Sequence, residues 1–222
     1  RLLVDATRFA DPDFPGPCWH NVTIMEPDVP PIAGPKCFDE PSVFRVDGLL
    51  REARRQRGLG DRPVPEVCLL DPDGDVVRHL VHEGLAVRHE DWACYHSELW
   101  LTECADREIG IVPCAVGAPY AVLVATELHA SGCDLVVSVT SAGRILPLSD
   151  PPYFVLIERA WRDEGTSQHY MAPSAWATLR PEFLSQMQGA FDCLDEPVLV
   201  GRSWTTDAPF RETASSIAQA EE

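Results

Sequence analysis

A strand–helix–strand succession in the middle of the chain constrains the fold more than any other feature. Glu108–Val116 (EIGIVPCAV) is an apolar run with the length of a buried strand, and a Gly-Ala-Pro sequence follows it. Ala118–Ser131 has the length and spacing of a well-packed helix that ends at Gly132, and Cys133–Val139 (CDLVVSV) is again strand-like. Such a succession predicts a right-handed crossover between two paired parallel strands. Both strands would then end at the same edge of an α/β sheet.

Other segments extend the α/β pattern on both sides. Val43–Gln56 has helical spacing, whereas Val76–Val81 fits either a short helix or a strand. Polar segments follow the predicted strands, which is where open α/β sheets place their ligand sites. The remaining predicted elements are strands at Val64–Leu70, Tyr153–Trp161 and Glu196–Val200, and helices at Pro181–Phe191 and from Arg211 onward.

The composition excludes two broad classes of partner. The 222 residues carry a formal net charge of −17, and a general nucleic-acid surface or an anionic membrane surface needs a basic face. No apolar run approaches the roughly 20 residues of a membrane span, and no charged-then-apolar leader begins at Arg1. We therefore expect a cytoplasmic protein. A small anion is still a suitable ligand, because one local arginine can dominate a pocket.

The cysteine and histidine patterns predict neither a disulfide framework nor a metal site. The eight cysteines form no C-x-x-C pair, and several lie in apolar strand-like runs, so reduced thiols are expected. Four histidines between residues 79 and 96 also lack the spacing of a zinc motif. We expect no metal and no other cofactor.

The first part of the chain differs in character from the rest. Residues 1–42 are rich in proline and show little periodicity, which is typical of an extended arm. With the helix that follows, this arm makes up residues 1–63. Residues 64–222 form the predicted α/β domain, and a hydrophobic content of 45% is enough to build a substantial core.

Val198–Thr213 (VLVGRSWTTDAPFRET) concentrates polar candidates near the end of the sequence. An apolar strand is expected to stop at Gly201 and to lead into a polar loop. One interpretation is a ligand site with hydroxyl groups, one acid and one fixed cation. The other is a plain helix entry, with a threonine or the aspartate as N-cap. The side chains concerned are Ser203, Thr205, Thr206, Asp207 and Arg211.

Three stretches together resemble the nucleoside phosphorylase superfamily, which includes uridine and purine nucleoside phosphorylases and related nucleosidases. In chain order they are GAPYAVLVATELHASGCDLVVSVTSAGRI, ERAWRDEGTSQHY and VGRSWTTDAPFRET. The resemblance covers the sequence from about Val64 onward. It implies a three-layer α/β/α sandwich with a mixed, distorted central sheet. It also implies cleavage of the N-glycosidic bond of a nucleoside, with phosphate or water as acceptor.

The resemblance assigns roles to two groups of residues. The loop of Thr140, Ser141, Ala142 and Gly143 would contact ribose and phosphate. Asp207 would be the base-side aspartate, which is the general acid in purine-cleaving relatives. Cleavage passes through a ribosyl oxocarbenium ion, so such a site must stabilise charge on the sugar and help the base to leave.

Four further residues would belong to the substrate pocket by the same resemblance. Arg211 approximates the base-binding arginine of uridine phosphorylases, and Thr205 and Thr206 line the base side. Arg162 falls in the loop that carries an arginine, a glycine, a serine and a histidine in uridine phosphorylases. For Arg162 we favour a structural or subunit-interface role over direct contact with substrate.

The sequence departs from phosphorolytic relatives where they hold phosphate. Those relatives carry a Gly-Asp-Pro-x-Arg turn, whereas here Leu70 replaces the glycine, no arginine follows, and Asp73 and Asp75 add carboxylates. Ser138 stands about where a second phosphate-binding arginine is expected. Each lost charge-assisted hydrogen bond is worth roughly 1.5–3 kcal/mol. We therefore expect weakened phosphate binding.

A second departure concerns the ribose. Relatives continue into a Val-Glu-Met-Glu segment whose glutamate binds ribose hydroxyls, whereas this sequence stops at Glu222. Either the sequence is cropped, or the protein lacks that element.

Three functions follow from these observations. The first is a nucleoside phosphorylase, a pentosyltransferase of the uridine-cleaving type with phosphate as co-substrate. The second is a water-using nucleosidase, with Asp73 or Glu83 as candidate general base. The third is a non-catalytic nucleoside-binding or scaffold protein. The resemblance also implies a homo-oligomer, either a dimer or a larger assembly.

Overall fold

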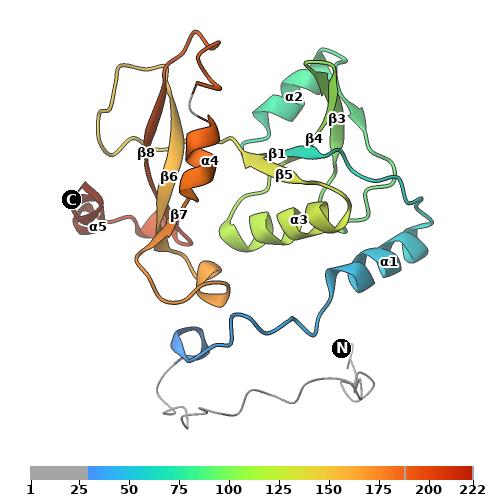
Figure 1. Cartoon of the computed structure of the whole chain (residues 1–222), viewed down its shortest axis with the longest axis horizontal. Coiled ribbons are helices and arrows are strands. Elements are labelled where there is room, and N and C mark those ends of the chain that lie inside the picture. Colours follow the sequence, from blue (N-terminus) through green and yellow to red (C-terminus); the bar gives the residue numbers. More distant parts are fainter. Residues whose placement is uncertain (1–29, 188, 222) are drawn as a thin grey trace.

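The computed structural model describes residues 30–187 and 189–221, which form two β-sheets surrounded by helices (Figure 1). The first sheet consists of β1 (Val67–Asp71), β2 (Val87–Arg88), β3 (Trp100–Cys104), β4 (Arg107–Pro113) and β5 (Leu135–Ser138). Its strand order is β2-β3-β4-β1-β5. β4 and β5 run parallel to β1, whereas β3 is antiparallel to both β4 and β2. The carboxyl ends of β1, β4 and β5 therefore meet at one edge.

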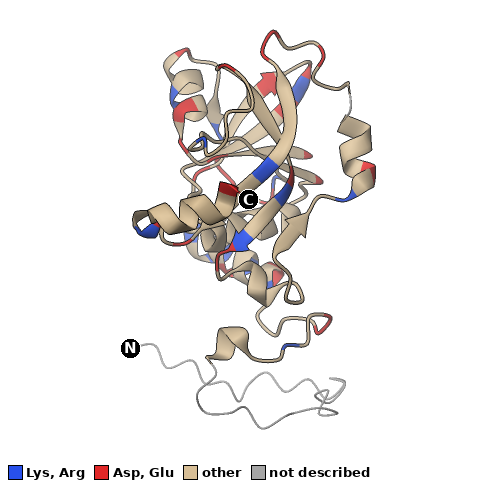
Figure 2. Cartoon of the chain, turned by 90° about the vertical axis from the view of Figure 1, so that its left-hand side faces the viewer, with Lys and Arg blue, Asp and Glu red and all other residues tan. Residues whose placement is uncertain are grey.

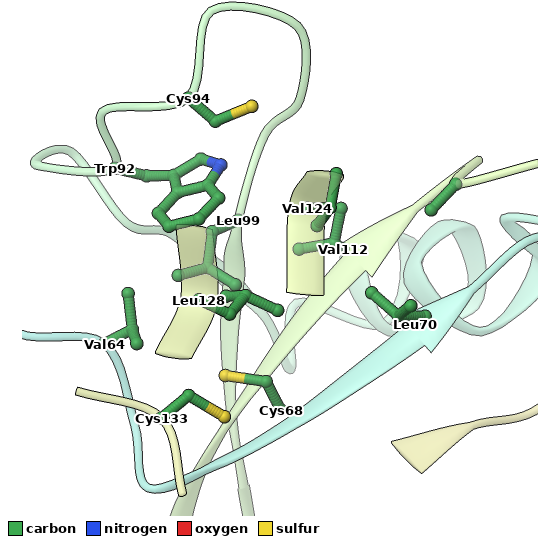
Figure 3. Packing of buried hydrophobic residues seen from close by; sticks show 11 residues of the cluster. Val64, Cys68, Leu70, Trp92, Cys94, Leu99, Val112, Val124, Leu128 and Cys133 are labelled. Carbon is green, nitrogen blue, oxygen red and sulfur yellow. The ribbon is translucent and has the colours of Figure 1, made fainter. Parts of the chain in front are cut away.

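The hydrophobic core lies against the first sheet and is shown in Figure 3. Helix α3 (Ala118–Ala130) contributes Val124 and Leu128, which pack with Cys68 and Val112 of the sheet; all four are completely buried. Burying a side chain of this size contributes about 1.5–3 kcal/mol. Helix α1 (Val46–Arg57) buries Leu50 and Ala53 in a smaller adjoining cluster, and α2 (Asp75–His82) follows β1.

The second sheet is built from β6 (Phe154–Asp163), β7 (Trp176–Thr178) and β8 (Val198–Thr206), in the order β7-β6-β8. β8 is parallel to β6, and β7 is antiparallel to it. Trp161 is in register with Trp176 and Trp204, and its ring lies 6.5 Å and 5.8 Å from theirs. The short helices α4 (Pro181–Met187) and α5 (Ala214–Glu221) belong to this part of the chain.

The two sheets differ in burial. Every buried hydrophobic side chain in the described ranges lies between Leu50 and Cys133, and thus in the first sheet, its helices and the loops that connect them. The tryptophans of β6 and β8 are half-buried, and their aliphatic residues are half-buried or exposed. Three 3₁₀ turns complete the described chain: η3 (Pro31–Ala33), η4 (Ser167–His169) and η5 (Pro209–Arg211). None of the helices placed by the structure has the length and apolarity to cross a membrane.

The structure confirms the predicted α/β class with mixed sheets and most of the predicted elements. The ambiguous segment Val76–Val81 is helical and belongs to α2. The seven cysteines in the described part are free thiols. Cys18 and most of the proline-rich arm, residues 1–29, lie outside the described residues.

Two details of the prediction were wrong. β4 and β5 are parallel but do not pair with each other, because the apolar strand β1 lies between them. The strand expected to stop at Gly201 continues to Thr206, since the Trp and Thr side chains that follow favour a strand and pair with β6 as far as Asp163. Ser203, Thr205 and Thr206 are therefore strand residues, and the loop begins at Asp207.

Glu127 is an acidic side chain inside the core that the sequence did not single out. It lies on α3 with 3% of its surface exposed, and its Oε2 has no hydrogen-bond partner among the described residues. Burial raises the pKa of its carboxyl above the ordinary 4.5, and this outweighs the opposing effects of the Cys94 thiol and the His96 ring. The folded state therefore binds this proton more tightly than the unfolded state.

Replacement of Glu127 by glutamine is expected to remove a pH-dependent loss of stability. Because the folded-state pKa is raised, the free energy of unfolding falls as pH increases from 4.5 through that pKa. Glu127→Gln should therefore gain stability relative to wild type above this window, by about 1–3 kcal/mol. Urea denaturation at pH 5 and pH 8 measures the difference. The exposed Glu103→Gln on β3 is the control, and equal pH dependence in wild type and Glu127→Gln would refute the assignment.

Candidate active site

Asp71 organises the edge where β1, β4 and β5 end. Its side chain is 1% exposed, and its two carboxylate oxygens accept hydrogen bonds from the backbone N–H groups of Gly74 and Val77, both at 3.0 Å. These bonds fix the turn after β1 and the first turn of α2. The amide of Cys114, just beyond β4, donates to the carbonyl oxygen of Asp71 at 2.8 Å. The ends of two neighbouring strands are thereby tied together.

Asp73 connects this turn to the predicted ribose and phosphate loop. Its Oδ2 accepts a hydrogen bond from the backbone N–H of Ser141 at 2.7 Å, and the hydroxyl groups of Ser141 and Thr140 donate at 3.3 Å and 3.4 Å. The Ser141 amide bond is the main reason that the pKa of Asp73 lies below its ordinary value. Ala142 and Gly143 are exposed, with open space around Gly143. Asp73 and the loop residues therefore form one polar cluster, which we call the strand-edge cluster.

Asp207 belongs to a second cluster at the end of the second sheet. Its Oδ2 accepts a hydrogen bond from the backbone N–H of Gly165 at 2.7 Å, which joins the loops after β8 and β6. Nearby, Trp204 Nε1 donates to Asp163 Oδ2 at 3.0 Å. A Cβ on Gly165 would lie 3.1 Å from the Ile32 side chain, so the proline-rich segment packs against this loop. The Asp207 carboxylate is exposed to solvent.

Arg162, near the end of β6, bonds to the loop that follows Gly165. It is 9% exposed, and its guanidinium group donates five hydrogen bonds within the segment that follows β6. The shortest go to the hydroxyl groups of Ser167 and Ser174, both at 2.8 Å. These contacts give Arg162 the geometry of a structural residue that holds the loop in place.

The other predicted pocket residues flank Asp207 in the sequence. Thr205 and Arg211 are exposed, and Thr206 Oγ1 accepts a hydrogen bond from the amide of Ala208 at 3.2 Å. The following turn η5 has no side-chain cap, so the Asp207 carboxylate bonds to Gly165 instead of capping a helix. The helix-entry interpretation of this stretch is therefore not what the structure shows.

The structure divides the predicted site residues into two groups. Thr140 and Ser141 meet Asp73, and Asp207 meets the loop that Arg162 supports. No hydrogen bond or ion pair within residues 30–187 and 189–221 links the two groups. In Figure 1, β5 ends on the side of the first sheet that faces β6. Sequence reasoning missed the Gly165 contact, for which the only signal was a glycine within a charged loop.

The charges at the strand-edge cluster are mainly negative. Asp75 pairs with Arg78, one turn further along α2. Arg144 donates to the carbonyl oxygen of Ser149 at 3.3 Å and thus bonds within its own loop. On the side shown in Figure 2, basic residues are interspersed with acidic ones and form no broad basic face. In the part of the chain placed by the structure, no His, Cys, Asp and Glu side chains are grouped as metal ligands.

Solved structures of nucleoside phosphorylases share this fold. Uridine phosphorylase from Vibrio fischeri ES114 is 19% identical over 73% of this chain and 67% of its own, with a TM-score of 0.60. Purine nucleoside phosphorylase from Toxoplasma gondii, in complex with immucillin-H, is 13% identical over 73% of this chain and 66% of its own, with a TM-score of 0.59. The chain thus spans about two thirds of each structure. No curated protein matches the sequence.

A sequence model of a protein family gives the decisive comparison. The model described as the phosphorylase superfamily matches residues 66–222, which is well over half of the chain. The match includes the strand-edge cluster and the loop of Asp207. The chain belongs to the phosphorylase superfamily.

Proposed function

We propose that the protein is an enzyme that cleaves the N-glycosidic bond of a nucleoside. Membership of the phosphorylase superfamily supports this, and so does the presence of exposed hydroxyl groups and carboxylates at strand ends. The single observation that carries most weight is the placement of Asp207. Its carboxylate is exposed at the end of β8 and is oriented by one short hydrogen bond from Gly165. A carboxyl group so placed has a fixed position, and its other oxygen, Oδ1, has no hydrogen-bond partner among the described residues and is available to the base.

The roles follow from the demands of the reaction. As the bond to the base breaks, positive charge develops on the ribose and negative charge on the base. Asp207 would donate a proton or a hydrogen bond to the leaving base, and the loop of Thr140–Gly143 would bind the sugar. Thr205, Thr206 and Arg211 would select the base, with a uridine-type nucleoside favoured. Arg162 would act by keeping the loop of Gly165 in position.

Two acceptors are compatible with this proposal. Phosphate is the acceptor expected from the resemblance to uridine phosphorylases. Water is the second candidate, and a specific observation favours it: the carboxylate of Asp73 is bonded to the loop that would hold phosphate. We also propose a cytoplasmic homo-oligomer in which residues 1–63 assist assembly around the domain of residues 64–222.

Release of free base from a nucleoside panel tests the proposed function. The full-length protein is incubated with uridine, inosine and adenosine, with and without phosphate, and the products are separated by chromatography. Release of uracil or of a purine base supports the proposal. Binding of nucleosides in calorimetry without base release would instead favour a nucleoside-binding protein. If the protein neither binds nucleosides nor releases base, a scaffold role is the one that remains.

A further inference from the structure

We propose that Asp73 takes the place of an anionic acceptor at the Thr140–Gly143 loop, so that the glycosyl group is transferred to water. The proposal rests on the proposed function, because it names the acceptor of that reaction. It makes Asp73 a specificity-determining residue that selects a neutral acceptor over phosphate.

The geometry of the loop is the first argument. The backbone N–H of Ser141 and two hydroxyl groups converge on one carboxylate, at distances of 2.7 Å, 3.3 Å and 3.4 Å. A backbone amide and hydroxyl donors that converge at the carboxyl ends of parallel strands are typical of an anion-binding site. Here the protein fills this position with its own carboxylate, so an external anion would have to displace it.

The local charge is the second argument. Asp73 and Asp75 both follow β1, and the arginine nearest to them in sequence, Arg78, is paired with Asp75. A phosphate dianion at the loop would therefore face an ionised carboxylate at close range without a guanidinium group bonded to the loop in the described structure. Because the Asp73 carboxylate is exposed and partly screened by water, one such like-charge contact lowers the affinity for phosphate by about tenfold.

The same loop geometry and negative charge that disfavour phosphate can accommodate water as the acceptor. It is neutral and small, and the Oδ1 atom of Asp73 has only the weak 3.3 Å contact with Ser141, which leaves it able to accept a hydrogen bond from water. As the C–N bond breaks, its electron pair leaves with the base, which takes up a proton. The water oxygen forms the new bond to the anomeric carbon, and its surplus proton passes through Asp73 to solvent. The products are the free sugar and the free base, and no further reactant is needed.

The first experiment follows the products of the wild-type protein. Base release should proceed at the same rate with phosphate removed as with 10 mM phosphate, and the sugar product should be ribose rather than ribose 1-phosphate. A strict requirement for phosphate would overturn the role of Asp73 while leaving nucleoside cleavage intact. Absence of base release under either condition would instead refute the proposed function.

The second experiment measures phosphate binding and does not depend on turnover. Asp73→Asn removes the charge but keeps an oxygen that can accept from Ser141, and Asp75→Asn removes the same charge two residues away. In calorimetric titrations with inorganic phosphate at fixed ionic strength, Asp73→Asn should bind at least about tenfold more tightly than wild type. Asp75→Asn should stay close to wild type.

The rates of base release by the two variants give a further test of the role of Asp73. In phosphate-free buffer, base release by Asp73→Asn should fall about tenfold or more, whereas Asp75→Asn should keep its rate within about twofold. If wild type binds phosphate as tightly as Asp73→Asn, or if both variants gain affinity equally, Asp73 does not occupy an acceptor site and the inference is wrong.

Discussion

Replacement of Asp207 by asparagine is expected to lower base release by about 10²–10⁴-fold, the range typical of a lost general acid. Asparagine keeps an oxygen that can accept the hydrogen bond from Gly165, so the loop should stay in place. It has no carboxyl proton to give to the leaving base. The loss should therefore appear in kcat, with the KM for nucleoside changed much less. Steady-state kinetics with the best substrate of the panel provides the measurement.

Asp163→Asn is the matched control for this prediction. Asp163 ends β6 beside the same cluster, and its carboxylate bonds to Trp204 instead of Gly165. Its replacement removes an identical charge at the same end of the second sheet, and base release should stay within about threefold of wild type. If the Asp207 and Asp163 variants lose activity equally, the loss comes from removing a negative charge at this end of the sheet. Asp207 would then not be the general acid.

Replacement of Arg162 by leucine should produce the largest loss of stability in the second sheet, about 3 kcal/mol or more. Five hydrogen bonds disappear, and acceptors such as the carbonyl oxygen of Ala172, bonded at 2.9 Å, are left without their donor. Hydrogen bonds from a charged donor contribute about 1.5–3 kcal/mol each, and the losses are not fully additive. Urea denaturation followed by tryptophan fluorescence suits this region, because three tryptophans lie together in the second sheet.

Arg202→Leu is the control for Arg162→Leu. Arg202 is an exposed arginine on β8, in the same sheet, and its change should alter the free energy of unfolding by less than about 0.5 kcal/mol. Base release by Arg162→Leu should also fall, because the loop that orients Asp207 loses its support. Stability equal to that of wild type would show that the hydrogen bonds of Arg162 are not structural.

Local patterns in the sequence were enough to predict the core of the fold. The apolar runs that became β1, β4 and β5 and the helix α3 are long and bounded by glycine or proline, so their type and position followed from pattern alone. The strand order did not follow, because a crossover fixes handedness and direction but not whether a third strand is inserted between the pair.

The candidate site was less predictable because its contacts join distant parts of the chain. Asp73 and Ser141 are 68 residues apart, and Gly165 and Asp207 are 42 apart. A turn sequence such as Asp-Pro-Asp-Gly predicts a turn, but it does not indicate which loop the second aspartate contacts. The polar end of β8 was misassigned for a similar reason, since pairing with β6 outweighed the polar composition of the segment.

The central claim is that the strand-edge cluster and the loop of Asp207 bind one nucleoside between them. A crystal structure of the full-length protein with an uncleavable nucleoside analogue tests this most directly. The account predicts that sugar hydroxyl groups lie within about 3.2 Å of Thr140 or Ser141 and that the base contacts Asp207. An analogue that contacts only one of the two clusters, or neither of them, would contradict it.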